Sequence, residues 1–120
     1  MALSITINNV DQATDSLYVR GSISASGSYT SGGDTLDFSG KGDLPASTPP
    51  RDMFIHGVSG FVYEFVRGSI LANNKVVLRG QQPTSVTSGV IALSEIAAAA
   101  YPAGVTGDTI TFLAIFDKLL

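Results

Sequence analysis

The residues of this chain that could perform chemistry are few and scattered. His56 is the only histidine and there is no cysteine, which excludes a histidine-rich metal site, a thiolate nucleophile and cysteine-based zinc binding. A Ser/His/Asp triad would have to use His56, yet the chain has neither a Gly-x-Ser-x-Gly nucleophile motif nor a Gly-x-x-x-x-Gly-Lys phosphate loop. We therefore expect His56 to be a structural or surface residue and the protein not to be an enzyme.

The acidic residues do not form an obvious dyad or metal site either. Asp34 and Asp37 are three apart at the start of a predicted strand, so they cannot share a face with a period of two. Asp34 and Asp108 each stand between a glycine and a threonine, where an aspartate typically caps turn N–H groups, and no calcium-loop pattern surrounds them. The two similar segments are 33–38 and 107–112. Each has an upstream tyrosine, Tyr29 or Tyr101, that could pack over its turn.

Two further residue classes allow two interpretations each. Six aromatic residues could form a sugar-stacking platform, but the absence of tryptophan and the inward strand periodicity favour core packing. They are Tyr29, Phe38, Phe54, Phe61, Tyr63 and Tyr101. The four arginines, at positions 20, 51, 67 and 79, fit a protein interface and solvated strand ends equally well.

The content of charged residues, the net charge and the lengths of the apolar runs limit the classes of partner that we expect. Charged residues make up 14% of the 120 residues, against about 25% in a typical soluble domain, and the net charge is −3. This acidic balance argues against a phosphate-tracking nucleic-acid partner, and no cofactor is implied. The N-terminal sequence lacks a basic region followed by an apolar run, and no stretch approaches a membrane span, so we expect no membrane association and synthesis in a cytoplasm.

Alternating apolar and polar residues predict a single all-β domain over residues 1–120. Short strands are predicted within 3–7, 15–24, 35–38, 61–66 and 108–117. The last of these is apolar on both faces and should be central, and the valines around Glu64 suggest that the outer face of 61–66 is also partly covered. The predicted core contains Phe61, Tyr63, Phe65, Ile110, Phe112 and Phe116. We expect a small β-sandwich or a partly closed β-barrel with at most one short helix.

Two local predictions concern connecting segments. Residues 70–78 have the pattern of a hairpin whose pair Asn73-Asn74 can take positive φ. Residues 94–100 form the only helix-prone window, with Ser94 placed to cap the helix and Pro102 to stop it.

The segment 39–51 carries three of the five prolines and cannot pair inside a sheet, so we expect an extended arm or a long loop. A proline-rich segment loses little entropy on ordering and is suited to lie on a partner. The candidate partner-interface residues are Leu44, Pro45, Pro49, Pro50 and Arg51.

Several segments together resemble small structural proteins of tailed bacteriophages. The resemblance runs over most of the chain from Tyr29 onwards, and its motifs are turns and strands. They are Tyr29-Thr30-Ser31-Gly32-Gly33-Asp34-Thr35-Leu36-Asp37-Phe38, the stretch ending Pro49-Pro50, Tyr63-Glu64-Phe65-Val66 with the Leu71-Ala72-Asn73 turn, and the run from Ala99-Ala100-Tyr101-Pro102 to Thr111-Phe112. In size, β-richness and Pro/Gly/Ala content the chain is also similar to lambda-type decoration proteins, although no motif carries over residue by residue.

This resemblance implies a capsid decoration, or cement, protein that binds the major capsid protein on the outside of the virion head. The low charge, the lack of cysteine and the proline-rich segment suit that function. Two alternatives stay open: a tail or connector subunit, and a receptor- or glycan-binding virion module, which would need exposed aromatic residues. The surplus of apolar strand surface predicts a homo-oligomer, and analogy with decoration proteins makes a trimer the first choice.

Overall fold

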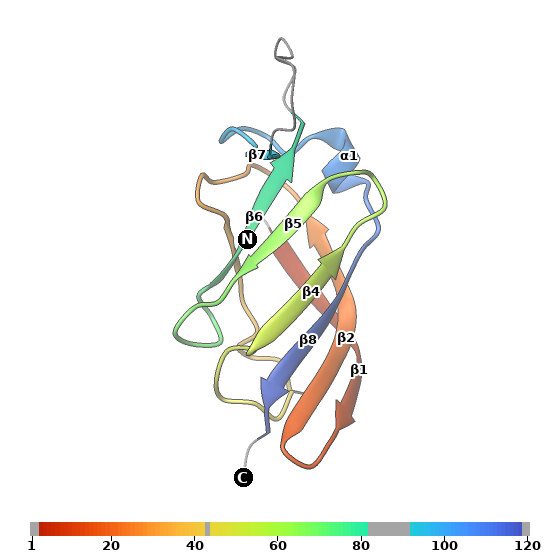
Figure 1. Ribbon diagram of the computed structural model, residues 1–120, viewed down its shortest axis with the longest axis vertical. Helices are drawn as coiled ribbons and strands as arrows, with labels where there is room; N and C mark the ends of the chain where they lie inside the picture. The colour runs from red at the N-terminus through yellow and green to blue at the C-terminus, as the bar shows by residue number, and fades with distance from the viewer. Residues whose placement is uncertain (1–2, 43, 82–91, 119–120) are drawn as a thin grey trace.

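The computed structural model of the protein describes residues 3–42, 44–81 and 92–118, and the chain forms two antiparallel β-sheets (Figure 1). The first sheet contains, in order, β1 (Leu3–Gln12), β2 (Ser16–Ala25), β8 (Ile110–Asp117) and β4 (Asp52–His56). The second contains β3 (Asp34–Leu36), β6 (Asn74–Gly80) and β5 (Val62–Val66), with β7 (Ser94–Glu95) also paired to β6. One short helix, α1 (Ala103–Thr106), precedes β8.

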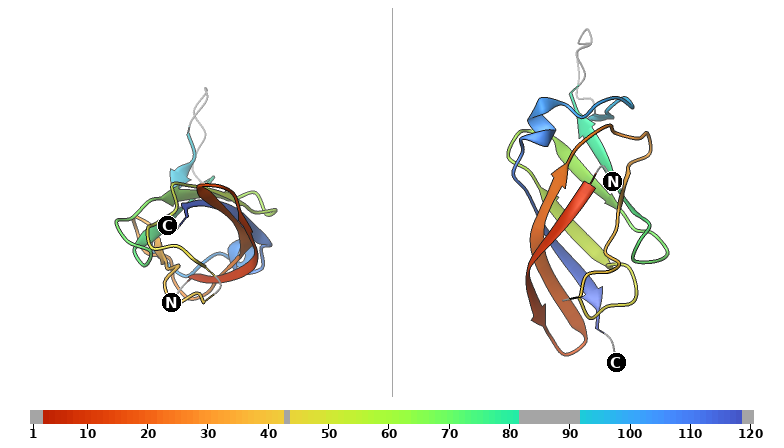
Figure 2. Two further views of the ribbon diagram at one scale, coloured as in Figure 1. Left: turned by 90° about the horizontal axis from the view of Figure 1, so that it is seen from below. Right: turned by 180° about the vertical axis from the view of Figure 1, so that it is seen from behind.

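The two sheets curve around a shared interior, which is visible when the molecule is viewed along its long axis (Figure 2). β4 and β5 lie side by side, but no strand pairing joins the sheets there within the described ranges, so the barrel is not closed. The arrangement is sandwich-like, which confirms the predicted all-β class.

The closing strand β8 lies between β2 and β4, as its two apolar faces predicted. Its inner residues stand opposite inner residues of β2, for example Leu17 opposite Phe116 and Ile23 opposite Ile110. On its other side, β8 pairs with β4 from Thr111 to Ile115. Because β8 is paired on both sides, neither of its backbone edges is open. Its inward face is buried, whereas its outward face carries the exposed Thr111 and Asp117.

The core is built from side chains of both sheets. Phe38, which follows β3, makes edge-to-face contacts with Phe112 and Phe116 at ring-centroid distances of 5.9 and 5.1 Å. Such contacts add about 0.5–1.5 kcal/mol each to the free energy gained from burial alone. Ile110, Phe112 and Phe116 are buried as predicted, whereas Phe61, Tyr63 and Phe65 are half-buried and pack against the margin of the core.

The predicted helix over 94–100 is wrong. Ser94 and Glu95 form β7, and the following backbone is engaged by neighbouring segments: Ile96 N–H donates to Leu78 O, and Ala99 O accepts from Tyr29 N–H. The helix begins instead after Pro102, whose missing N–H suits a helix N-terminus. Alanine propensity is a weak preference, and tertiary hydrogen bonds override it here.

The hairpin predicted within 70–78 is also misplaced. The turn runs from the end of β5 to the start of β6, over 67–73, and none of the described residues other than glycine has positive φ. Asn73 and Asn74 instead stabilise this turn through their side chains. The outer face of β5 is not covered as expected, because Val62 and Val66 keep 44% and 42% of their surface exposed.

Candidate functional site

The five predicted interface residues do not form a free arm. The segment containing them has no strand and lies against the domain, with Leu44, Pro49 and Pro50 buried and Leu44 part of the core. Pro45 is half-buried and Arg51 is exposed. Of the two alternatives, arm or loop, the segment is therefore a packed loop, and only Pro45 and Arg51 of the candidate set present substantial surface to a partner.

Arg67, Arg51 and Lys41 form hydrogen bonds or ion pairs between this loop and the rest of the chain. Arg67 donates to the carbonyl oxygens of Pro50 and Pro49 at 2.9 and 3.3 Å. Arg51 forms an ion pair of 2.7 Å with Asp117 at the end of β8, and its backbone N–H donates to Ile115 O.

At the other end of the loop, the Lys41 ammonium donates to the carbonyl of Ile5 on the edge strand β1. The remaining two arginines also have intramolecular partners, since Arg20 pairs with Asp11 at 2.9 Å and Arg79 with Glu64 at 3.2 Å. All four arginines thus have partners within the chain, a role that the sequence analysis did not anticipate, and the choice between a protein interface and solvated strand ends stays open.

The α1 end of the molecule is held by three tyrosine–carboxylate pairs that the sequence did not reveal. Tyr29 donates to Glu95 at 2.6 Å, Tyr63 to Asp108 at 2.6 Å, and Tyr101 to Asp34. Tyr101 therefore binds the aspartate of the other Gly-Asp-Thr segment, not its own.

The two Gly-Asp-Thr aspartates also accept backbone hydrogen bonds, as expected of capping residues. Asp34 accepts from the N–H of Thr30, and Asp108 accepts from the N–H of Val58. The structural role predicted for these residues is confirmed. In the case of Asp108 the partners are distant in sequence: Val58 lies in the loop after β4, and Tyr63 lies on β5.

The pairs shift the acidity of their members in a consistent direction. Burial, and then the hydrogen bond to Glu95, raise the pKa of Tyr29 to about 12. Burial likewise raises the pKa values of Tyr63 and Tyr101 well above the ordinary range. The Tyr29 hydroxyl and the Gly32 N–H lower the pKa of Glu95. In the Tyr29–Glu95 and Tyr63–Asp108 pairs the raised pKa of the phenol and the lowered pKa of the carboxyl group favour a neutral phenol beside an ionised carboxylate.

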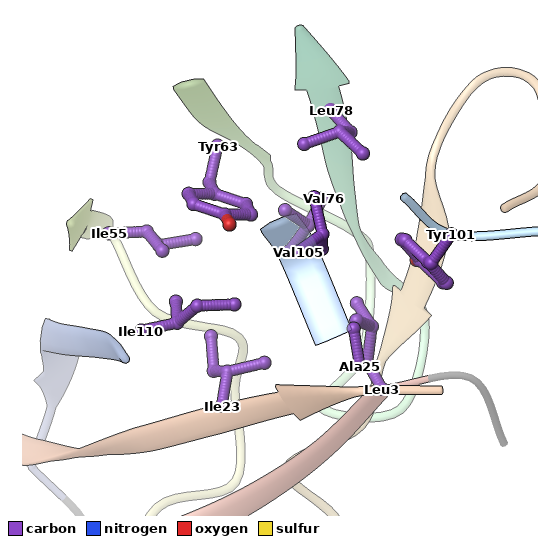
Figure 3. A pocket seen from close by; sticks show the side chains of 10 residues that line it. All are labelled: Leu3, Ile23, Ala25, Ile55, Tyr63, Val76, Leu78, Tyr101, Val105 and Ile110. Atoms are coloured by element: carbon purple, nitrogen blue, oxygen red, sulfur yellow. The ribbon is translucent and has the colours of Figure 1, made fainter. Parts of the chain in front are cut away.

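An apolar cavity is lined in part by two of these tyrosines (Figure 3). Tyr63 and Tyr101 line it together with aliphatic side chains that include Val76, Val105 and Ile110. Its free volume is about 10 Å³, which is roughly the minimum for one water molecule, and its lining is apolar. The cavity is a packing gap and not a ligand site.

The outer face of the first sheet carries a wide, open groove of about 400 Å³, here called the Phe54 groove. Phe54 and His56 of β4 form one side, and Arg20 of β2 and Asn8 of β1 form the other. Its floor includes Thr111 and Leu113 of the central strand β8. Asn8 lies at an irregularity in the pairing of β1 with β2, between Ile7 and Asn9. Phe54 keeps 59% of its surface exposed.

The exposure of Phe54 corrects its predicted place in the core. Met53 and Ile55 point inward, so Phe54 shares the outer face of β4 with Asp52 and His56. Asp52 and His56 each stand two positions from Phe54, and this polar pattern in the sequence indicated that the Phe54 side chain points outward. His56 is an exposed surface residue, as expected.

No group of three or more His, Cys, Asp or Glu residues suited to a metal ion occurs in the described parts of the chain. Among the same residues, no helix is long and apolar enough to cross a membrane. Comparisons with models of known protein families, with curated proteins and with solved structures find no significant match.

Proposed function

We propose that this protein is a bacteriophage capsid decoration, or cement, protein that acts by binding other protein subunits. The observation that carries the proposal is the apolar outer surface on strands of both sheets. It includes Phe54 on β4, Val62 and Val66 on β5, and Tyr18 on β2. Large apolar side chains that stay exposed on regular strands are candidates for contact with a partner.

The charge distribution supports the same proposal. The arginines are already engaged within the chain, in ion pairs or with backbone carbonyls, and the overall charge density is low. Such a surface suits a partner recognised by shape and apolar contact more than by charge. The major capsid protein and sister copies of the chain, with a trimer as first choice, are the proposed partners, and the capsid surface is the proposed location.

A decoration protein stabilises the capsid through the contacts that it adds, without a chemical reaction. Each copy that binds across a seam between capsomers adds contacts which must break before the shell opens, and several copies act together. We expect capsids stripped of the protein to rupture at a lower temperature than complete capsids, and to recover when the protein is added back. Equal thermal stability with and without the protein would overturn the proposal. Its detection by mass spectrometry in purified tails alone would favour the tail or connector alternative.

A second candidate, a glycan-binding virion module, is favoured by one observation. Tyr18 and Phe54 are exposed aromatic residues on one face of the first sheet, and exposed aromatics were the requirement for this alternative. Titration with neutral oligosaccharides, followed through chemical shifts of Phe54 and Tyr18, tests it. Unchanged shifts at millimolar sugar would remove it.

A further inference from the structure

The Phe54 groove is built from two rows of side chains on the outer face of the first sheet. In one row, Phe54 of β4 stands opposite Leu113 of β8, which in turn stands opposite Arg20 of β2. In the next row, His56 of β4 stands opposite Thr111 of β8. Residues directly opposite each other on paired strands lie on the same face. An aromatic and aliphatic row therefore adjoins a polar row on one exposed surface.

The polar side chains of the groove have hydrogen-bonding groups to offer a ligand. Within the described ranges, the side chains of Asn8, His56 and Thr111 form no hydrogen bond with another residue. An amide, a neutral imidazole and a hydroxyl can each donate and accept. Arg20 binds Asp11 through Nη1, and its guanidinium carries further N–H donors. The groove thus offers both donors and acceptors beside an aromatic ring.

Asn8 lines the groove at a point where β1 contains one extra residue. Ile7 pairs with Gly21 and Asn9 pairs with Arg20, which leaves Asn8 without a partner on β2. Bulges of this kind redirect a side chain and are frequent beside functional sites. The irregularity is an observation independent of the aromatic ring, and it favours a binding site at the same place.

The chemistry of these groups favours a sugar over other classes of ligand. A nucleic acid needs unpaired cations, whereas Arg20 is paired with Asp11 and the same face carries Asp52. A mainly apolar protein surface would leave the polar row of the groove without hydrogen bonds. A sugar ring has an apolar C–H face and hydroxyl groups at its rim, so it matches an exposed aromatic ring flanked by groups that both donate and accept.

The size of the groove fits one or two sugar rings. A cavity of about 150 Å³ accommodates benzene, which is also a six-membered ring, and the groove has a volume of about 400 Å³. Its open form allows a chain of sugar units to continue beyond it in either direction.

A second exposed aromatic residue lies further along the same face. Tyr18 of β2 stands opposite Ile115 of β8, which stands opposite Asp52 of β4, so Tyr18 lies one row away from Phe54 on the other side of β8. Two strand spacings of about 4.8 Å and one two-residue step of about 6.8 Å separate their Cα atoms by roughly 12 Å. A single sugar ring covers one of these aromatic side chains, whereas an oligosaccharide can contact both.

We propose that the outer face of the first sheet binds a neutral linear oligosaccharide. One sugar ring stacks on Phe54 while its hydroxyl groups bond to Asn8, His56 and Thr111, and the chain continues toward Tyr18. The inference rests on the second candidate function, of which it names the site and the mode of binding, and it does not require capsid binding. Val62 and Val66 of β5, on the other sheet, stay available to a protein partner.

The test is a titration of the purified full chain with cellohexaose, maltohexaose and chitohexaose, and with the methyl glycoside of each sugar unit. Binding is followed through backbone amide chemical shifts, and folding through circular dichroism. Phe54→Thr removes the stacking ring, Thr111→Val removes a hydroxyl with little change of shape, and Tyr18→Thr removes the second ring; all three keep residues suited to a strand. Val62→Thr is the matched control, because Val62 is also exposed and apolar but lies on β5.

We expect the wild type and Val62→Thr to bind at least one hexaose alike, with shifts centred on the groove. Phe54→Thr should raise the dissociation constant about 10- to 100-fold, as loss of one large apolar contact predicts. Thr111→Val should raise it about 2- to 10-fold, as loss of one hydrogen bond predicts. Tyr18→Thr should weaken binding of the hexaose and leave binding of the methyl glycoside unchanged, because only the longer ligand reaches Tyr18.

Two results would overturn the inference. One is the absence of shifts with all three hexaoses at millimolar concentration. The other is equal binding by the wild type, Phe54→Thr and Thr111→Val, which would place the sugar outside the groove. Neither result bears on the capsid experiment, since a protein that binds no sugar can still raise the temperature at which capsids rupture. Conversely, capsids that rupture at the same temperature without the protein would overturn the decoration function and leave the sugar site standing.

Discussion

Replacing Phe112 by alanine tests whether the strand faces of the first sheet are assigned correctly. Phe112 retains 4% of its surface exposed, and its ring meets Phe38 edge-to-face at 5.9 Å across the two sheets. Truncation to alanine removes the buried ring and leaves a cavity, which for phenylalanine costs about 3–5 kcal/mol of the free energy of unfolding. That is a large part of the roughly 5–15 kcal/mol available to a small domain.

The matched control is Phe54→Ala, which removes the same atoms from the neighbouring strand β4. Phe54 points outward and is 59% exposed, so its loss should change the free energy of unfolding by no more than about 0.5 kcal/mol. The two variants differ in burial and not in chemistry. Any difference between them therefore measures the contribution of the core.

Urea unfolding followed by circular dichroism is the assay, at a protein concentration low enough to keep the chain monomeric. With a slope of about 1–3 kcal/mol per molar urea, Phe112→Ala should lower the midpoint by about 1–5 M with an unchanged slope. Its melting temperature should fall by roughly 10–20 °C. Equal midpoints for Phe112→Ala and Phe54→Ala would refute the assignment of inner and outer faces.

Three further perturbations test other parts of the structure. Burial opposes the ionised form of Asp108, but the hydrogen bonds from Tyr63 and from backbone N–H groups together outweigh it and lower the pKa of Asp108. The stability that these bonds contribute is therefore present above the ordinary aspartate pKa and is lost as the pH falls through the lowered value. Tyr63→Phe should weaken the dependence of the urea midpoint on pH between pH 7 and pH 2, and an unchanged dependence would contradict this. Arg67→Ala removes the donor to two proline carbonyls, and amide exchange over 44–51 should accelerate at least several-fold while exchange in β8 stays the same; equal acceleration everywhere would indicate global destabilisation. Gly21→Ala would place a methyl group against the backbone oxygen of Thr6 on β1, so we expect the free energy of unfolding in urea to fall by about 1–3 kcal/mol, and wild-type stability would show that β1 shifts freely.

Alternation of apolar and polar residues identified most strands, because in an antiparallel strand with one buried face every second side chain is buried and the others are exposed. This held for β1, β2 and β8, whose inner residues alternate regularly. It failed for Phe54, where Met53, Phe54 and Ile55 are all apolar and only the polar residues on either side distinguish the faces. It also failed for the outer face of β5, since apolar residues on both faces do not reveal which face is covered.

Local propensity failed where distant segments supply the hydrogen bonds. The alanine-rich window after Glu95 is held by backbone bonds to 27–29 and to β6, so its preference for a helix has no effect. The proline-rich segment was correctly predicted to lie outside the sheets, because proline lacks an N–H. Its position against the domain involves Arg67, which donates to Pro50 O, and Asp117, which pairs with Arg51, and both of these partners come from other parts of the sequence.

The sequence alone thus determined the all-β class, the central place of β8 and the position of the single histidine on the surface. These properties depend on composition and on spacings of a few residues. Only the tertiary structure decided which tyrosine binds which carboxylate, that Leu44 and Pro50 are buried, and that Phe54 and Ile70 are exposed on separate surfaces. Those features depend on contacts between residues dozens of positions apart, such as Tyr101 with Asp34, and the register and curvature of the sheets fix these contacts in three dimensions.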